Sequence, residues 1–181
     1  MTRHNEREPI AIIGIGCRFP GQASNPQRFW DLLCQKTDAI IDVPEDRWDI
    51  RRFYDPNINV PGKMIVKRGG FLKEKWHEFD AEFFHISPRE AKFLDPQQRL
   101  LLEVSWEAME DAGLVPHFLR GADGGIFIGA FTTDWQTLQN SPYNRHHCEM
   151  YSGINGSKTI LSARLSHFFD LKGPCLSVDT A

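Results

Sequence analysis

The C-terminal residues Val178-Asp179-Thr180-Ala181 are the most informative part of the chain. An apolar strand that ends in a small residue just before a sharp turn is how many folds present a nucleophile. The position that would occupy this turn, 182, lies beyond the 181 residues of the sequence. We therefore expect a chain that ends just before the residue that would carry its chemistry.

Three histidine and cysteine residues in a row, His146-His147-Cys148, are potential metal ligands. Adjacent side chains of an extended segment point in different directions, and no second cluster completes a site, so a surface loop is favoured. The cysteines are unevenly spaced and form no C-x-x-C pair, which indicates neither a disulfide framework nor a zinc site. They are Cys17, Cys34, Cys148 and Cys175.

The glycine pair Gly14 and Gly16 resembles the start of a dinucleotide-binding fingerprint. That fingerprint needs a third glycine three residues later, where a helix begins. Phe19 occupies that position and is followed by Pro20-Gly21, which begins a turn. Close backbone packing in a loop is therefore favoured over a dinucleotide-binding module.

The charge pattern gives little support for nucleic acid or a membrane as partner. The chain has 21 basic and 24 acidic residues, with no long block of like charge,. No apolar run is long enough to span a bilayer, and the polar N-terminus lacks a secretory signal. We expect a cytoplasmic protein with reduced thiols. Between Arg47 and Lys75, eight basic residues face three acidic ones, which indicates either an acidic protein partner or a solvated face,.

The elements that must position this C-terminal segment follow from periodicity and capping signals. The apolar run 9–16 predicts a buried strand, and Asn25-Pro26 begins a helix with Phe29, Leu32 and Leu33 buried,. Residues 37–80 predict an irregular insertion, because their aromatic, proline and glycine residues show no lasting period.

Two helix starts follow that insertion. Ser87-Pro88-Arg89-Glu90 forms a capping box, and Asp95-Pro96-Gln97-Gln98 repeats its logic, with Gln98 reaching back to the cap,. The second helix is expected to be largely buried and to end at Gly113. A strand at 124–130, a loop at 132–151, a helix at 156–169 and a final strand complete an α/β layered fold with a largely parallel sheet.

Four stretches of this chain resemble the N-terminal half of a β-ketoacyl synthase, the condensing domain (ketosynthase) of polyketide synthases. They are IAIIGIGCRFPG (10–21), VPEDRWD (43–49), FDAEFFHISPREAKFLDPQQRLLLEVSWEAMEDAG (79–113) and LSARLSHFFDLKGPCLSVDTA (161–181). The DRWD and DPQQRLLLE segments favour the polyketide-synthase branch over the free-standing bacterial fatty-acid enzymes. In this interpretation, residues 1–7 are a polar leader and 8–181 are the N-terminal domain, with the irregular insertion at about 37–80.

The resemblance implies a thiolase-like fold: the N-terminal half of an αβαβα sandwich, incomplete at its C-terminus, in a domain that is usually a homodimer. It implies decarboxylative Claisen condensation, an acyltransferase reaction of the 3-oxoacyl-[acyl-carrier-protein] synthase type. A cysteine takes the acyl chain from an acyl carrier protein, and a malonyl-type thioester supplies the attacking carbanion. Both thioesters are carried on the 4′-phosphopantetheine of the carrier, and the domain itself binds no cofactor or metal.

The resemblance places no catalytic residue within this chain. In the family, the nucleophile directly follows the VDTA segment, at position 182 here, and two catalytic histidines lie in the C-terminal half. Asp179, Thr180 and Ala181 are expected to position the nucleophile, whereas Cys175, His85 and His167 match scaffold positions. The fragment alone is therefore expected to be inactive and prone to aggregation. The alternative is a non-catalytic partner or an inactive truncated gene product. Cysteine at position 182 would support the enzyme, whereas glutamine or a stop codon there would favour the alternative.

Overall fold

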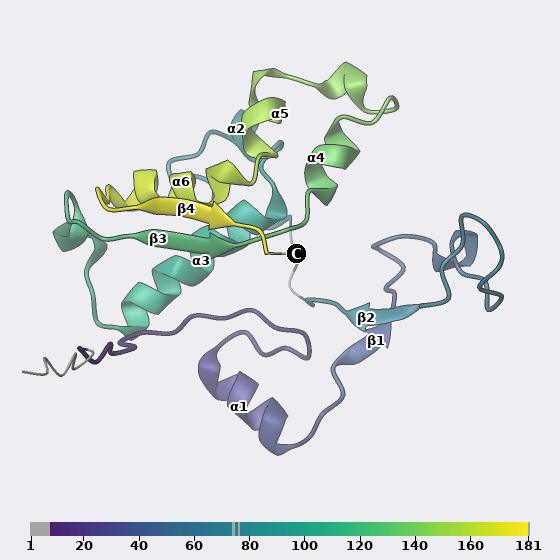
Figure 1. Ribbon diagram of the computed structural model, residues 1–181, viewed down its shortest axis with the longest axis horizontal. Helices are drawn as coiled ribbons and strands as arrows, with labels where there is room; N and C mark the ends of the chain where they lie inside the picture. The colour runs from purple at the N-terminus through teal and green to yellow at the C-terminus, as the bar shows by residue number, and fades with distance from the viewer. Residues whose placement is uncertain (1–7, 74, 76, 181) are drawn as a thin grey trace, which may run out of the picture.

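The two longest strands form a parallel pair in the computed structural model, which describes residues 8–73, 75 and 77–180. β3 (Ile126–Gly129) lies beside β4 (Cys175–Val178), with Ile126 opposite Cys175 and Gly129 opposite Val178. Helix α6 (Thr159–Phe169) runs along one face of this pair (Figure 1). Burial alternates along both strands, as a sheet covered on one face requires,. The opposite face exposes Phe127 and Leu176.

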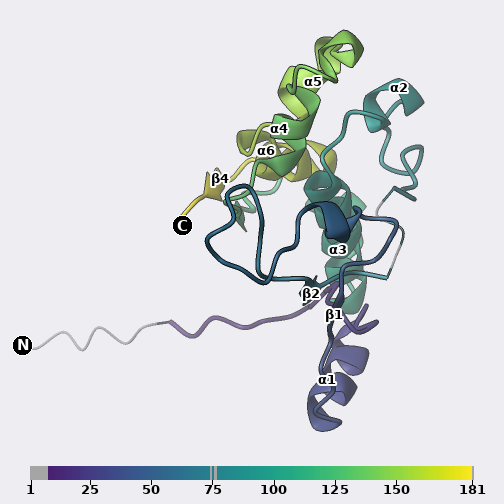
Figure 2. The same cartoon turned by 90° about the vertical axis from the view of Figure 1, so that its right-hand side faces the viewer.

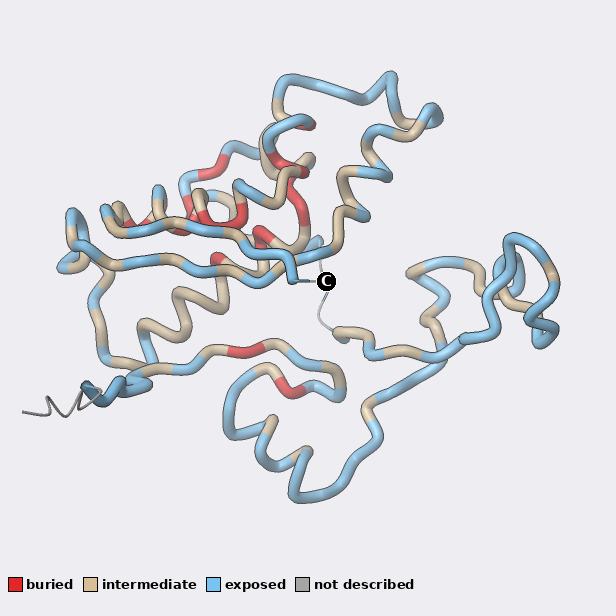
Figure 3. The backbone as a smooth tube through the Cα atoms, in the orientation of Figure 1, coloured by how far each residue is buried: buried red, intermediate tan, exposed pale blue. Residues whose placement is uncertain are grey.

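The core lies between α6, helix α3 (Pro96–Asp111) and the segment that precedes α3. Leu102 of α3 and Leu165 and Phe169 of α6 are almost fully buried. Each such side chain stabilises the fold by about 1.5–3 kcal/mol through its removal from water. Figure 3 shows buried positions around α6 and the start of α3, and others in the N-terminal segment, where Cys17 and Ala23 are buried, whereas 40–70 is mostly exposed.

The helix starts expected from the sequence are confirmed, and each is capped by a residue close to it in the chain. Helix α2 (Pro88–Ala91) begins where the Ser87 hydroxyl accepts from the Glu90 amide at 3.2 Å. Helix α3 begins where the Asp95 carboxylate accepts from the Gln97 amide at 2.8 Å. Gly113 follows α3 with φ +66°, the left-handed conformation in which glycine ends helices,. The expectation that Gln98 reaches back to the cap is wrong, because its amide donates to the Asn155 carbonyl.

The expected buried strand at 9–16 is not formed. This segment pairs with no strand among the described residues, and Ile10 and Ile12 are 95% and 83% exposed. Its glycines instead let the backbone lie against α3: a Cβ added to Gly14 would fall 2.1 Å from the Ala108 carbonyl oxygen. The expected close backbone packing is therefore confirmed. Figure 2 shows the first described residues extending away from the helices and strands.

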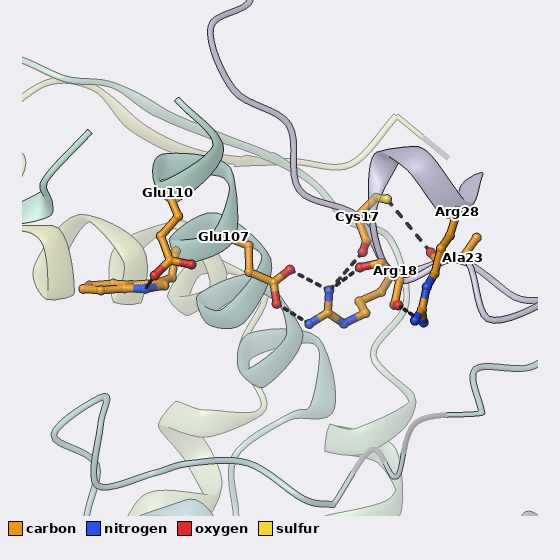
Figure 4. A network of polar contacts seen from close by, with 8 residues as sticks. Cys17, Arg18, Ala23, Arg28, Glu107 and Glu110 are labelled. Carbon is orange, nitrogen blue, oxygen red and sulfur yellow. Dashed lines mark hydrogen bonds and ion pairs between the residues drawn. The ribbon is translucent and has the colours of Figure 1, made fainter. Parts of the chain in front are cut away.

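Arg18 fixes the next part of the chain to α3 (Figure 4). Its guanidinium donates to both carboxylate oxygens of Glu107 and to the Ser24 carbonyl at 2.9 Å. Helix α1 (Pro26–Cys34) then begins at Asn25, whose side chain accepts from the Arg28 amide. Only part of the expected apolar stripe of α1 is covered: Phe29 and Leu32 are half-buried, whereas Leu33 is exposed.

The described residues of 37–80 are mostly irregular and include three short elements. β1 (Ile40–Asp42) pairs antiparallel with β2 (Arg68–Gly70), and a 3₁₀ turn, η1 (Ile50–Arg52), lies between them. Several basic side chains of this segment have local acidic partners: Arg51 and Arg52 contact Asp49, and Arg68 contacts Asp38. These pairs support the solvated-face alternative.

The expected loop at 132–151 contains short helices, so that expectation is wrong. They are α4 (Asp134–Gln139), the 3₁₀ turn η3 (Arg145–His147) and the start of α5 (Met150–Asn155). Tertiary contacts stabilise α4: Trp135 Nε1 and Gln139 Nε2 both donate to the Phe93 carbonyl, at 2.8 and 2.9 Å. Helices this short depend on such contacts rather than on their own composition. A further 3₁₀ turn, η2 (Pro116–Leu119), follows α3.

Two classes of site are not present in the part of the chain that the structure describes. No helix there is long and apolar enough to cross a bilayer. No group of three or more histidine, cysteine or acidic side chains there is arranged to hold a metal ion. His146 and His147 lie exposed in η3, in agreement with the expected surface position.

Candidate functional site

The candidate site is the edge at which the carboxyl ends of β3 and β4 meet. Parallel strands end at the same edge of their sheet, and ligands of open α/β sheets bind outside that edge. The Ala130 amide donates to the Val178 carbonyl at 3.0 Å and extends the pairing by one step. Asp179 and Thr180 leave β4 at this edge, and Ala181 lies outside the described residues.

Lys158, immediately before α6, joins the two strand ends. Its ammonium donates to the carbonyl of Phe131, which follows β3, at 3.1 Å and to the carboxylate of Asp179. Both side chains of this ion pair remain partly exposed. We call this interaction of Lys158 with Phe131 and Asp179 the strand-end contact.

One helical turn further on, Ser162 contacts Ser177 of β4. Their hydroxyl oxygens lie 2.9 Å apart, and the Ser162 amide donates to the Ser177 hydroxyl at 3.3 Å. We call this interaction the hydroxyl contact. Positions i and i+4 share one face of a helix, and positions i and i+2 share one face of a strand. The pairs Lys158–Asp179 and Ser162–Ser177 therefore align α6 with β4 through two successive contacts.

A polar network holds the other side of α6. Arg164 donates to the Gln98 side-chain oxygen at 2.6 Å and to the Asn155 side-chain oxygen at 2.8 Å, and it forms an ion pair with Glu90 at 3.0 Å. Gln98 and Asn155 are almost fully buried. Satisfied buried networks of this kind fix the relative position of the elements that they join, here α2, α3, α5 and α6. No local sequence pattern indicates this network, because its members lie up to 74 positions apart in the chain.

Burial also changes the titration of two residues at the start of α3. It raises the pKa of the Asp95 carboxyl, although the Gln97 amide and side chain donate to that carboxylate. It lowers the pKa of Arg99, whose guanidinium donates to the carbonyls of Leu94 and Ala91. These two residues secure the turn between α2 and α3.

The structure places Cys175 and the candidate histidines away from the strand ends. Cys175 begins β4, so Asp179 lies about 13 Å further along an extended backbone,. Cys175 and His167 line a 500 Å³ cavity, and His85 lines a separate 560 Å³ cavity with Trp106 and Phe168. Burial raises the pKa of the Cys17 thiol and so disfavours its reactive thiolate form,.

The residues that sequence reasoning missed at this edge are Lys158 and the two serines of the hydroxyl contact. The signal for them is the matched spacing, four residues in the helix and two in the strand. That signal becomes informative only once the packing of α6 on β4 is known. Chemically, the edge offers one ammonium, one carboxylate and the backbone that continues from β4.

Comparison with known proteins agrees with this architecture. The chain matches the family model "Beta-ketoacyl synthase, N-terminal domain" over residues 7–181. It is 47% identical over 182 residues to a phenolphthiocerol/phthiocerol polyketide synthase of Mycobacterium tuberculosis, and 45% identical over 178 residues to erythronolide synthase EryA2 of Saccharopolyspora erythraea. These alignments cover 100% and 98% of this chain but only 12% and 5% of the relatives.

Solved ketosynthase structures share the fold. The oxazolomycin ketosynthase domain OzmH KS7 of Streptomyces albus superposes with a TM-score of 0.83 at 36% identity, covering 93% of this chain and 28% of that one. The ketosynthase from module 6 of the Bacillus subtilis bacillaene synthase gives 0.74 at 35% identity, covering 94% and 26%. The expected thiolase-like α/β fold is thereby confirmed. The chain belongs to the β-ketoacyl synthase family of condensing transferases, in which it corresponds to the N-terminal part of a polyketide-synthase ketosynthase domain.

Proposed function

We propose that this chain supplies the N-terminal half of a ketosynthase that catalyses decarboxylative Claisen condensation. The reaction is of the 3-oxoacyl-[acyl-carrier-protein] synthase type. The match to the β-ketoacyl synthase N-terminal domain over residues 7–181 carries the proposal. The β3–β4 edge supports it, because two strand ends and the start of α6 meet there.

In this proposal, Asp179, Thr180 and Ala181 position a cysteine that follows them in the complete domain. Its thiolate attacks the incoming acyl thioester and releases the carrier thiol, so that the acyl group is held on the cysteine. The extender then loses carbon dioxide, and the resulting carbanion attacks the acyl carbonyl carbon. A carbon–carbon bond forms and the cysteine leaves again as thiolate. Two histidines, contributed from outside this chain, promote decarboxylation and stabilise developing oxyanion charge.

The proposed substrates are acyl and malonyl-type thioesters on the 4′-phosphopantetheine arm of an acyl carrier protein. The names of relatives support this class, since those from Mycobacterium tuberculosis and Streptomyces halstedii are polyketide synthases. We propose a homodimer for the complete domain. The exposed face of the β3–β4 pair supports further association, because soluble proteins rarely leave large apolar patches uncovered,.

The test is made in a completed domain, in which residues 1–181 replace the matching region of erythronolide synthase EryA2 and are followed by the residues that come next in that protein. The 45% identity over this region makes the exchange practicable. The completed domain is incubated with an acyl thioester and malonyl-carrier protein, and the 3-oxoacyl product is measured by mass spectrometry. Product formation is expected.

Two controls accompany the assay. Replacement of the cysteine that follows Ala181 by alanine should abolish acylation, and the 181-residue chain alone should not decarboxylate malonyl-carrier protein. A completed domain that matches the EryA2 domain in circular dichroism and oligomeric state but is never acylated would contradict the proposal and favour a non-catalytic role.

A further inference from the structure

Lys158 has no part in the chemistry proposed above, yet it contacts both strand ends. Its ammonium donates to the backbone after β3, through the Phe131 carbonyl, and to Asp179 after β4. Asp179 is the first residue of the segment expected to position the nucleophile. A lysine that contacts this residue can control where that segment lies.

We propose that Lys158 is a positioning residue for the condensation reaction. Through the strand-end contact, it fixes the backbone at Asp179 and therefore the path of the chain to the nucleophile. This inference rests on the proposed function and names a residue that acts on its site through Asp179.

The geometry separates this role from general stability. The hydroxyl contact between Ser162 and Ser177 joins the same helix to the same strand without Lys158. The network of Arg164 holds α6 from its other side. Partly exposed ion pairs also contribute little to stability. Removal of the Lys158 ammonium should therefore leave α6 packed on β4 and act chiefly on the segment beyond Val178.

The positive charge of Lys158 should also favour the proposed reaction. The expected nucleophile lies three positions after Asp179, and an extended chain covers at most about 10 Å over that distance. A carboxylate at this range opposes formation of a thiolate, and a neighbouring ammonium offsets this effect. Lys158 thus pairs with the acidic group of the positioning segment while it holds the backbone of that segment.

The proposal is tested by four variants of the completed domain: Lys158→Met, Lys158→Arg, Asp179→Asn, and the double variant Lys158→Met/Asp179→Asn. A small misplacement of a reacting group can reduce a rate by about 100-fold. Lys158→Met is expected to lower kcat for condensation by about 10- to 100-fold with little change in KM. Lys158→Arg should retain most of the activity, because it keeps the charge and the donors. The double variant should react faster than Lys158→Met, because the carboxylate that opposes the thiolate is gone.

Lys172→Met provides a matched control. Lys172 forms an equivalent ion pair, with Asp170 at 2.5 Å, in the turn between α6 and β4 rather than at the strand ends. Its loss is expected to change kcat by less than about twofold, as for an ordinary surface pair. Equal effects of Lys158→Met and Lys172→Met would overturn the proposal.

Amide hydrogen exchange separates this inference from the proposed function. Lys158→Met, but not Lys172→Met, should accelerate exchange at residues 130–131 and 179–180 and leave 161–169 unchanged. If the unmodified completed domain is active and Lys158→Met leaves kcat unchanged, the role of Lys158 is refuted and the proposed function stands. A completed domain that is inactive although its circular dichroism and oligomeric state match those of the EryA2 domain refutes the proposed function, and the exchange result then decides whether Lys158 orders the strand ends. Unchanged exchange at 179–180 in Lys158→Met would then overturn the role of Lys158 as well.

Discussion

The guanidinium of Arg18 donates to both carboxylate oxygens of Glu107, a residue 89 positions further along the chain. Two parallel donors from a planar guanidinium form one of the stronger and more directional polar contacts in proteins. The Arg18 side chain is largely buried, at 16% exposure, whereas that of Glu107 is 38% exposed. This pair links the N-terminal segment to α3.

Arg18→Met should therefore destabilise the completed domain by about 1–3 kcal/mol, because Glu107 loses its guanidinium in a partly buried position. Arg51→Met is the matched control, since Arg51 pairs with Asp49 at the surface and should leave stability almost unchanged,. Urea unfolding curves measure both. Similar losses in the two variants would show that the Arg18 pair is no more important than a surface contact.

Gly14→Ala should destabilise the completed domain, because the new Cβ would lie 2.1 Å from the Ala108 carbonyl oxygen. That oxygen belongs to the backbone of α3 and cannot move without distorting the helix. The expected loss is about 1–3 kcal/mol, as for other overpacked sites. Gly153→Ala is the control, because Gly153 lies within α5 with open space around it. It should raise stability by about 0.5–1 kcal/mol. Losses of equal size would argue against the contact of Gly14 with α3.

Asp95 makes stability depend on pH in a direction opposite to that of most carboxylates. Burial raises its folded-state pKa above the ordinary value of 3.8, so the native state binds more protons than the unfolded state in the pH window above that value. Stability then falls as pH rises through this window. Asp95→Asn keeps an oxygen that caps α3 and does not titrate. Its stability relative to the unsubstituted domain should therefore increase between pH 4 and pH 7.

Asp95→Ala separates capping from titration in the same unfolding experiment. It lacks the cap and should lose about 1 kcal/mol relative to Asp95→Asn at every pH. A stability difference between Asp95→Asn and the unsubstituted domain that stays constant with pH would refute the effect of burial on Asp95.

The isolated 181-residue chain should associate in solution. Phe127 and Leu176 are 65% and 51% exposed on the open face of the β3–β4 pair, and Ile10 and Ile12 are also uncovered. We expect binding of the dye ANS and elution as oligomers, both reduced in Phe127→Ser/Leu176→Ser. Tyr143→Ser removes an exposed aromatic residue from another surface and should reduce association less. A monodisperse monomer with one sharp melting transition would contradict this expectation.

The sequence predicts best those features whose cause is local. The N-caps Ser87 and Asp95 accept from amides two or three positions away, and both helix starts were predicted correctly, although neither Glu90 nor Gln98 completes the expected capping box. Helix α4 was missed because it is stabilised by bonds to the carbonyl of Phe93, more than 40 positions earlier. The composition of the helix itself does not indicate such a contact.

The apolar run 9–16 is a segment whose packing the sequence does not predict. Its apolar composition favours burial, but in the structure Ile10 and Ile12 are exposed, and Gly14 and Gly16 lie against α3 without a strand partner among the described residues. The candidate site divides in the same way. Asp179 and Thr180 are expected at the site from resemblance to a family motif, whereas Lys158 could be proposed only once the packing of a helix on a strand was known.

The alternation of side chains along β4 has a consequence for how the chain folds. If β4 slid by one residue beneath α6, Leu176 and Val178 would turn toward Ser162 and Lys158, and Ser177 and Asp179 would turn away,. Both polar contacts would be lost together, and two apolar side chains would face a hydroxyl and an ammonium. A misaligned form would therefore lose both contacts, so one alignment of β4 with α6 is favoured,.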